Sequence, residues 1–218
     1  MIEVTYIDHM GSDLSVVNAA RVSFGKKSEW MPRIHYGEQL VLKPKDAKLI
    51  KYLAKHKHKS PFNHTFVTFH VKAPIFVARQ LVKHEYMPWN EISRRYVDDD
   101  PEFYFPLTWR GRSTDKKQGS EGEVKSNFNI NYHTMTALKG YQQMLDEGVA
   151  PEQARMILPQ SMMTEWYWSG TLFAFAKMCS LRLKSDTQEE TQLVAQKVAL
   201  TMAKIYPVSW DALMEYAE

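Results

Sequence analysis

The sequence has a single cysteine, Cys179, among its 218 residues. One thiol cannot form an internal disulfide, which excludes a disulfide-stabilised secreted scaffold, so we expect a reducing, cytoplasmic environment. No apolar run approaches the ~20 residues that a membrane-spanning helix needs. The first residues also lack the basic start and apolar stretch of a signal peptide. We therefore expect no membrane partner.

Excess charge is also scarce, because 28 Lys and Arg against 25 Asp and Glu give a formal net charge of +3. A dedicated nucleic-acid binder carries a much larger basic excess, so we expect no nucleic-acid partner. No Cys and His residues show the spacing of a zinc site, and we predict no metal. The chain does have the composition of a folded protein, with 44% hydrophobic and 12% aromatic residues. Its length suits a single domain over residues 1–218.

Apolar periodicity predicts both strands and helices. Alternation with period two predicts strands over residues 2–7 and 65–72. Helical spacing predicts helices over residues 14–22, 46–55, 75–82, 134–147, 164–179 and 186–207. The last of these begins with Asp186 and Glu189 in a capping-box pattern. The aromatic residues of 164–179 predict a helix buried on several sides and favour subunit contacts.

Between these elements, residues 110–127 are rich in Gly, Ser, Lys and Glu and predict a polar surface loop. The densest cluster of recognition groups lies in residues 78–96, where cations, carboxylates, an imidazole and aromatic rings share nineteen positions. A solvated face carries charge too, but has little reason to interleave aromatic rings with it. The segment indicates a site for an anionic, aromatic small molecule. The basic residues 55–59 suit a phosphorylated ligand or, alternatively, the last turn of a helix.

The same segment resembles the signature of the flavin-dependent thymidylate synthases, in which Arg-His-Arg is followed by seven residues and Ser. Here Lys83-His84-Glu85, seven residues and Ser93 keep the register, while two of the three leading residues differ. Blocks similar to the family's occur in the same order at residues 13–15, 19–24, 69–80, 90–96, 154–159 and 181–183, followed by Gln188. The resemblance therefore spans nearly the whole chain.

This resemblance implies an α+β fold of mixed helices and a small central antiparallel sheet, assembled as a homotetramer. It implies an enzyme that methylates dUMP to dTMP with FAD as redox cofactor, methylenetetrahydrofolate as carbon donor and NADPH as reductant. Arg182 is implied to polarise the uracil ring so that its C5 becomes the nucleophile. No cysteine nucleophile is then required, and we expect Cys179 to be a small core residue.

The resemblance also assigns site residues. For dUMP they are Gln80, Leu81, Val82, Lys83, Glu91, Ile92, Ser93, Arg94, Arg95, Arg155 and Arg182. For FAD they are Ser23, His58, Ser60, Lys83, His84, Glu85, Glu91, Thr171 and Lys177. Arginine suits phosphate and carbonyl oxygens alike, although a surface ion pair is an equally ordinary role for it. His58 and His84 could likewise be structural histidines whose ring nitrogens are hydrogen-bonded within the protein.

Glu85 stands where the family usually has arginine, which changes the local charge by two units. An uncompensated carboxylate near a phosphate costs binding energy, so we expect Glu85 to pair with a cation, Arg94 or another nearby. We favour Arg94, because it replaces a glycine in the same loop. Two alternatives to the synthase remain open. One is a relative that hydroxymethylates deoxyuridylate, and the other is an inactive paralogue that still binds flavin or nucleotide.

Overall fold

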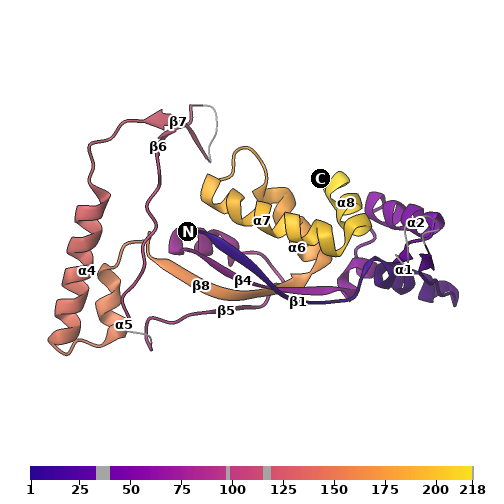
Figure 1. Ribbon diagram of the computed structural model, residues 1–218, viewed down its shortest axis with the longest axis horizontal. Coiled ribbons are helices and arrows are strands. Elements are labelled where there is room, and N and C mark those ends of the chain that lie inside the picture. The colour runs from indigo at the N-terminus through magenta and orange to yellow at the C-terminus, as the bar shows by residue number, and fades with distance from the viewer. Residues whose placement is uncertain (33–39, 97–98, 115–118, 218) are drawn as a thin grey trace.

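The computed structural model describes residues 1–32, 40–96, 99–114 and 119–217. Its central element is a four-stranded antiparallel sheet with the strand order β1, β4, β8, β5 (Figure 1). The strands are β1 (Glu3–Met10), β4 (Phe66–Pro74), β8 (Met163–Thr171) and β5 (Trp89–Glu91). The predicted α+β class with a small central antiparallel sheet is therefore confirmed.

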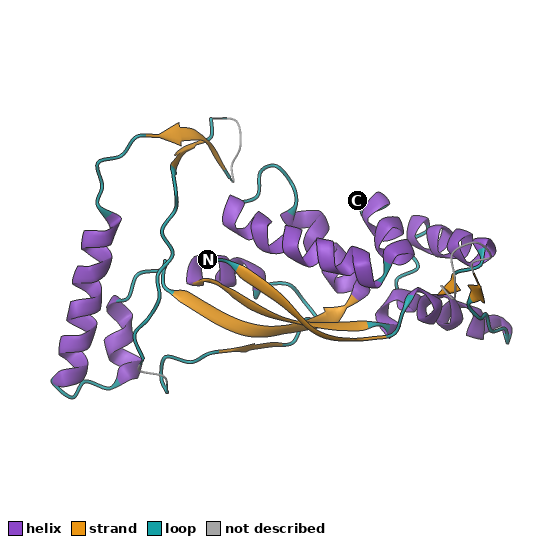
Figure 2. Ribbon diagram, viewed as in Figure 1, coloured by secondary structure: helices purple, strands orange, loops and turns teal. Residues whose placement is uncertain are grey.

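Side-chain alternation explains why only one face of this sheet is covered. Phe69 and Val71 of β4 are fully buried, and they lie opposite Trp168 and Trp166 of β8. These paired apolar side chains form the core face, because neighbours on adjacent strands stack on the same side. Figure 2 shows helices over this face, including α6 (Leu172–Arg182) and α7 (Glu189–Ile205). The opposite face carries polar residues such as His70.

A group of helices packs at one end of the sheet. It comprises α1 (Asp13–Arg21), η1 (Val22–Phe24), α2 (Pro44–Lys55), η2 (Ser60–His64) and α8 (Pro207–Glu215), with the short strands β2 (Met31–Pro32) and β3 (Leu40–Val41) beside it. The buried carboxylate of Asp13 accepts the backbone N–H groups of Val208 and Ser209 at 3.0 and 2.9 Å. This caps α8 where its dipole favours negative charge. No helix in the described ranges is long and apolar enough to cross a membrane.

At the other end of the sheet an arm extends away from the body (Figure 1). It contains β6 (Trp109–Arg112), β7 (Ser120–Val124), α4 (Ile130–Asp146), α5 (Pro151–Ala154) and η3 (Arg155–Ile157). The prediction of a loop over residues 110–127 is therefore wrong, because β6 and β7 pair as an antiparallel hairpin. Its strands are polar on both sides, so the sequence carries no alternation that would reveal them. Residues 115–118 of this segment lie outside the described residues.

Two predicted helices also differ from the structure. The predicted helix over 164–179 is wrong in its first half, which is strand β8, with Trp166 and Trp168 buried and Tyr167 facing outward. A continuous aromatic run hides this period-two pattern. The last long helix, α7, begins at Glu189, and no side chain caps it, so the capping box is absent. Pro207 starts the separate helix α8.

An ion cluster around the buried carboxylate of Glu190 fixes the arm hairpin to the start of α7. Arg110 donates through Nη2 to Glu190 at 2.6 Å, lies 2.9 Å from Glu189, and donates through Nε to Ser120 at 2.8 Å. Glu190 is 3% exposed. Burial alone would raise the pKa of Glu190, but the hydrogen bond and charge of Arg110 outweigh it and hold that pKa below its ordinary value.

Arg110→Ala should lower the free energy of unfolding by about 3–5 kcal/mol, because it leaves a buried carboxylate without its cation. Urea titration measures this change. Lys51→Ala is the matched control, since it breaks an exposed pair with Glu215 at 3.5 Å and should cost less than about 1 kcal/mol.

The loss of unfolding free energy in Arg110→Ala should depend on pH. Because the pKa of Glu190 is lowered in the folded state, its contribution is present above the unfolded pKa and is lost as the pH falls through the folded one. The difference between wild type and Arg110→Ala should therefore shrink in acid. A deficit at neutral pH no larger than that of Lys51→Ala would contradict this account of the cluster.

Candidate functional site

A polar hollow of about 810 Å³ lies where α3 (Ile75–Leu81) ends, beside β5 and the loop before α7. Its lining comprises Ile75, Ala78, Arg79, Gln80, Val82, Lys83, Glu91, Gly119, Arg182, Thr187 and Gln188. Three of these are cations and one is a carboxylate. Such a set suits an anionic ligand that also has N–H or O–H groups to donate.

The end of α3 is held in place by a hydrogen-bond network around Gln80. Its amide nitrogen donates to Gln188 at 2.5 Å, and its amide oxygen accepts from Thr191 at 3.1 Å. Arg182, on the last turn of α6, donates through Nη2 to the backbone carbonyl of Gln80 at 2.9 Å. Helices α3, α6 and α7 therefore meet at this point. Leu81, which the signature assigns to dUMP, is fully buried in the core and does not line the hollow.

Arg182 also contacts the signature histidine, because its Nε donates to His84 Nε2 at 3.1 Å. Burial, together with the charges of Arg182 and Lys177, lowers the pKa of His84 to about 4. The imidazole is therefore neutral near pH 7, and Nε2 acts as the acceptor with the ring proton on Nδ1. Burial also lowers the pKa of Arg182, but a guanidinium stays charged in proteins. The pair thus leaves a full positive charge at the hollow.

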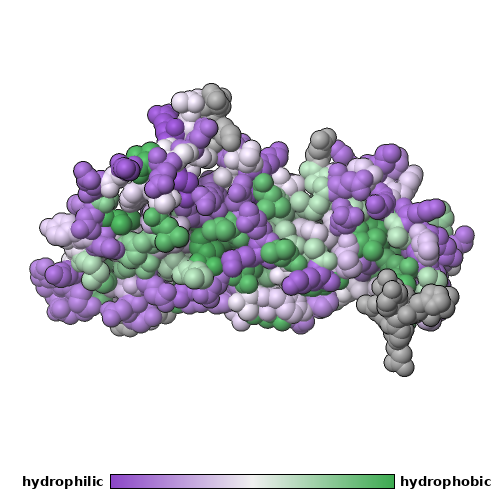
Figure 3. All heavy atoms as spheres, turned by 45° about the horizontal axis from the view of Figure 1, so that its top comes forward, coloured by the Kyte–Doolittle hydropathy of each residue, from purple (hydrophilic) through white to green (hydrophobic). Residues whose placement is uncertain are grey.

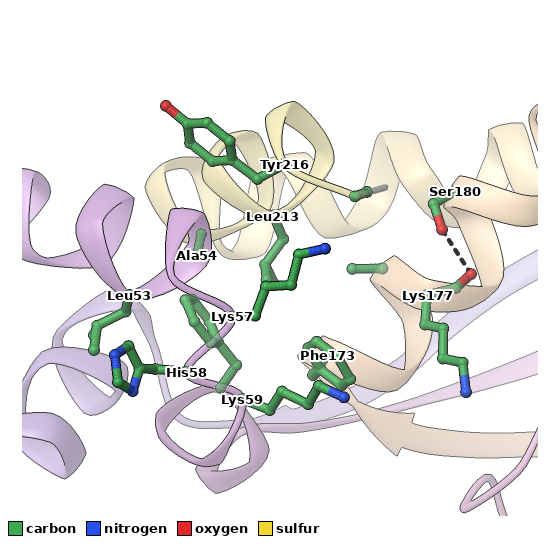
Figure 4. Close-up of a pocket in the computed structure, with 13 residues that line it drawn as sticks. Leu53, Ala54, Lys57, His58, Lys59, Phe173, Lys177, Ser180, Leu213 and Tyr216 are labelled. Carbon is green, nitrogen blue, oxygen red and sulfur yellow. Dashed lines mark hydrogen bonds between the residues drawn. The ribbon is translucent and has the colours of Figure 1, made fainter.

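A second, basic groove of about 360 Å³ lies between the end of α2, the face of α6 and the last helix α8 (Figure 4). Lys57, His58, Lys59 and Lys177 are among the residues that line it. The ammonium group of Lys59 lies 5.5 Å from the centre of the Phe173 ring. Cations around an aromatic ring suit a ligand that has both phosphate groups and a planar ring system.

The residues that the resemblance assigns to FAD lie along and beside this groove. His58 and Lys177 line it, and Ser60 begins η2 next to it. Thr171 caps α6 by accepting the N–H of Ala174 at 3.2 Å and donates to Asn63 at 2.9 Å. Ser23 is exposed on η1. Lys83 and Glu91 line the polar hollow instead, and His84 contacts Arg182 of that hollow.

Glu85 is not paired with Arg94 in this chain. Arg94 instead donates to Asp99, at 2.7 Å to the carboxylate and 2.6 Å to the carbonyl, because both residues lie in the turn after β5. The cation near Glu85 is Lys177, at 3.9 Å. The favoured pairing with Arg94 is therefore wrong within one chain, and the alternative of another nearby cation is the one observed. Lys177 thus lies at the basic groove and beside the signature segment.

The remaining assigned residues lie outside the polar hollow. Arg155 is exposed on the arm, where its Nε donates to the carbonyl of Glu152 at 3.3 Å. Arg95 donates to the hydroxyl of Tyr96 at 3.0 Å, and Ser93 Oγ accepts the N–H of Arg95 at 3.4 Å. Ile92 and Arg94 line a smaller hollow beside Lys72 and Glu102. The assigned anion-binding groups are therefore divided between separate regions of the chain.

Several residues at these sites were missing from the sequence assignment. Arg79 and Gln188 line the polar hollow, and Lys59 lines the basic groove. The sequence does contain signals for these residues. Arg79 and Gln188 fall in blocks similar to the family's, and Lys59 belongs to the basic residues 55–59. Thr191, which donates to Gln80, and Thr164, which donates to Glu91 at 2.6 Å, gave no signal, because each contact joins segments far apart in the sequence.

His84 should titrate near pH 4 in NMR spectra, well below the ordinary value of about 6.5 for a histidine. Arg182→Gln should raise that pKa, because it removes a nearby positive charge, but burial should keep it below the ordinary value. His84→Gln assigns the resonance by its loss. A wild-type His84 that titrates at its ordinary pKa would contradict the arrangement.

Comparison with known proteins identifies relatives across nearly the full chain. The family model described as thymidylate synthase complementing protein matches residues 5–208. A protein named flavin-dependent thymidylate synthase from Thermus thermophilus is 38% identical over 216 residues, which cover 98% of this chain and 76% of that protein. One from Kosmotoga olearia is 37% identical over 224 residues, covering 98% and 90%.

Among solved structures, the UMP/dUMP methylase PolB from Streptomyces cacaoi, bound with 5-Br dUMP, superposes with a TM-score of 0.82. It is 31% identical in sequence, and the match covers 100% of this chain and 96% of PolB. Both the sequence matches and the fold match point to the family that the signature segment resembles. That segment contributes Gln80, Lys83 and Glu91 to the polar hollow. This chain belongs to the family of flavin-dependent thymidylate synthases.

Proposed function

We propose that this protein is a flavin-dependent thymidylate synthase that methylates C5 of dUMP in the cytoplasm. The observation that carries the proposal is the polar hollow, where Gln80, Lys83, Glu91 and Arg182 converge from three separate segments. A solved relative that shares the fold is a methylase bound to a dUMP analogue. The carbon donor in this proposal is methylenetetrahydrofolate, and NADPH is the reductant.

Arg182 is the residue best placed to activate the uracil ring. Two of its N–H groups are used internally, by His84 and by the carbonyl of Gln80, so its remaining donors are available to a ligand. A guanidinium beside N3 and a ring carbonyl stabilises negative charge that develops on the ring, which makes C5 nucleophilic. Because His84 is neutral, it leaves this positive charge intact. Lys83 and Arg79 supply further cations for the phosphate.

The only cysteine takes no part in this chemistry. Cys179 is fully buried on α6, where its thiol donates to the carbonyl of Ala195 at 3.5 Å. Burial raises the pKa of this thiol far above its ordinary value, so a thiolate nucleophile does not form. The expectation of a small core residue is confirmed. Activation of C5 therefore rests on the groups that surround the ring.

The basic groove fits FAD in the chemistry of its donors. Lys59 and Lys177 would hold the pyrophosphate, with His58 beside them and the Phe173 ring available to a planar group. When bound and reduced by NADPH, the flavin would supply the hydride that reduces the transferred one-carbon unit. Glu85 does not argue against this fit, because Lys177 at 3.9 Å offsets its charge. No observation favours the hydroxymethylating or the inactive alternative over the synthase.

We further propose a homotetramer in which sites are shared between chains. Arg155 is exposed on the arm and lies outside the hollow of its own chain, although the family assigns it to the nucleotide. The arm also exposes large apolar side chains, among them Leu107, Phe128, Tyr132 and Met156. Green apolar areas lie on the arm and toward the middle of the face drawn in Figure 3. A second copy would cover such surface and receive Arg155 in its hollow.

Arg182→Ala should lower turnover of dUMP roughly 10²-fold or more, the scale for removing a preorganised charge-stabilising donor. Cys179→Ser should keep most of the activity. Both are measured as dTMP formed per flavin, and the flavin absorbance band reports that each variant is folded. A Cys179→Ser protein that is folded, carries flavin and is inactive would contradict a mechanism without a thiolate.

Co-expression of two inactive variants tests whether sites are shared. Arg155→Ala and Arg182→Ala should together restore part of the activity, because a mixed tetramer contains sites in which both arginines are intact. The matched control combines Arg182→Ala with Gln80→Ala, two changes in the same hollow, and should restore none. Equal activity in the two mixtures would contradict sites shared through the arm.

A further inference from the structure

The carboxylate of Glu91 is held from the side of the sheet by two donors. Thr164 Oγ1 donates to Oε1 at 2.6 Å, and Trp89 Nε1 donates to Oε2 at 3.0 Å. Each oxygen therefore has one partner from the chain itself. Glu91 is also the single carboxylate among the described residues that line the polar hollow.

Both donors are fixed by the sheet rather than by the hollow. Thr164 is 5% exposed on β8, and its β-branched side chain has few rotamers. The indole of Trp89 stacks on that of Trp166 with ring centres 4.3 Å apart and planes 18° apart. Beyond β5, the N–H of Ile92 donates to the carbonyl of Glu165 at 3.0 Å and keeps the strand paired. The donors thus present a rigid edge to a carboxylate that is itself exposed.

The hydrogen bonds from Thr164 and Trp89 keep Glu91 from forming ion pairs with the neighbouring cations. Arg79, Lys83 and Arg182 line the same hollow, yet among the described residues none forms an ion pair with Glu91. An exposed carboxylate without fixed partners would turn toward such a cation, because opposite charges at ~4 Å attract even in a wet site. That contact would consume both the acceptor and a cation needed for phosphate.

We propose that Thr164 and Trp89 are positioning residues that hold Glu91 as an acceptor for a donor group of the bound nucleotide. A carboxylate has about four acceptor sites, so two remain after Thr164 and Trp89 are satisfied. In dUMP the available donors are the N3–H group of the ring and the 3′-hydroxyl of the sugar. The inference rests on the function proposed above and extends it to residues outside the hollow.

The test compares variants that change one hydroxyl. Thr164→Val removes the donor and keeps the shape, whereas Thr164→Ser keeps the donor. Thr68→Val is the matched control, because it removes a 2.9 Å bond to Ser169 in the same sheet, away from the hollow. Thr164→Val should weaken dUMP binding about tenfold and raise KM by a similar factor, since a hydrogen bond to a charged group is lost or misdirected. The kcat should change much less.

Thr164→Ser and Thr68→Val should both bind dUMP like wild type. Trp89→Phe keeps an aromatic ring against Trp166 and should weaken binding in the same direction, so it carries the test if Thr164→Val does not fold. Binding is measured by calorimetry, and urea titration reports the stability of each variant. Equal dUMP affinity in Thr164→Val and Thr68→Val, or no rescue by Thr164→Ser, would overturn the proposal.

Two analogues identify the ligand's donor. The penalty of Thr164→Val should vanish with N3-methyl dUMP if the ring N–H is the donor, or with the 3′-deoxy analogue if the hydroxyl is. A penalty that persists with both would overturn the role of Glu91 as acceptor. A wild-type protein that methylates dUMP while Thr164→Val binds normally rejects only this inference. A flavin-loaded wild type that neither binds nor methylates dUMP rejects the proposed function itself.

Discussion

The pairing of β4 with β8 is the constraint on which the candidate site depends. β4 leads directly into α3, which carries Gln80, and β8 leads into α6, which carries Arg182. Because the strands are antiparallel, these helices start at opposite ends of the sheet. The eleven residues of α6 span about 16 Å, which brings Arg182 back to the end of α3. The other edge of β8 holds β5 and therefore Glu91.

The electrostatics of the site follow from how each charged group is restrained. Arg182 keeps its full charge because its partners are a neutral imidazole and a carbonyl. Glu91 is bound to the sheet by neutral donors and, among the described residues, forms no ion pair with the cations beside it. Glu85 lies near Lys177 at the other side of the signature segment. The cations of the hollow thus stay available to an anion, while the carboxylate of Glu91 is held beside them by the sheet.

The fold class was implied by the family resemblance, whereas the strand β4 and the signature segment each have a local signal in the sequence. The alternation over residues 65–72 and the register between His84 and Ser93 can be read from the sequence without tertiary contacts. The strand β8 was missed because an aromatic run gives no period. The hairpin of β6 and β7 was missed because its strands show no apolar alternation, and its contact with α7 joins Arg110 and Glu190, far apart in the chain. The roles of Thr164 and Lys177 depend on long-range pairing, and so does the partner of Glu85.

We propose above that this hollow converts dUMP to its C5-methylated product with the aid of a flavin. The most direct measurement is the mass of the product that the purified, flavin-loaded protein forms from dUMP, methylenetetrahydrofolate and NADPH. We expect dTMP, with its new methyl group on C5. A hydroxymethylated nucleotide, or unchanged dUMP from a protein that retains its flavin, would contradict it.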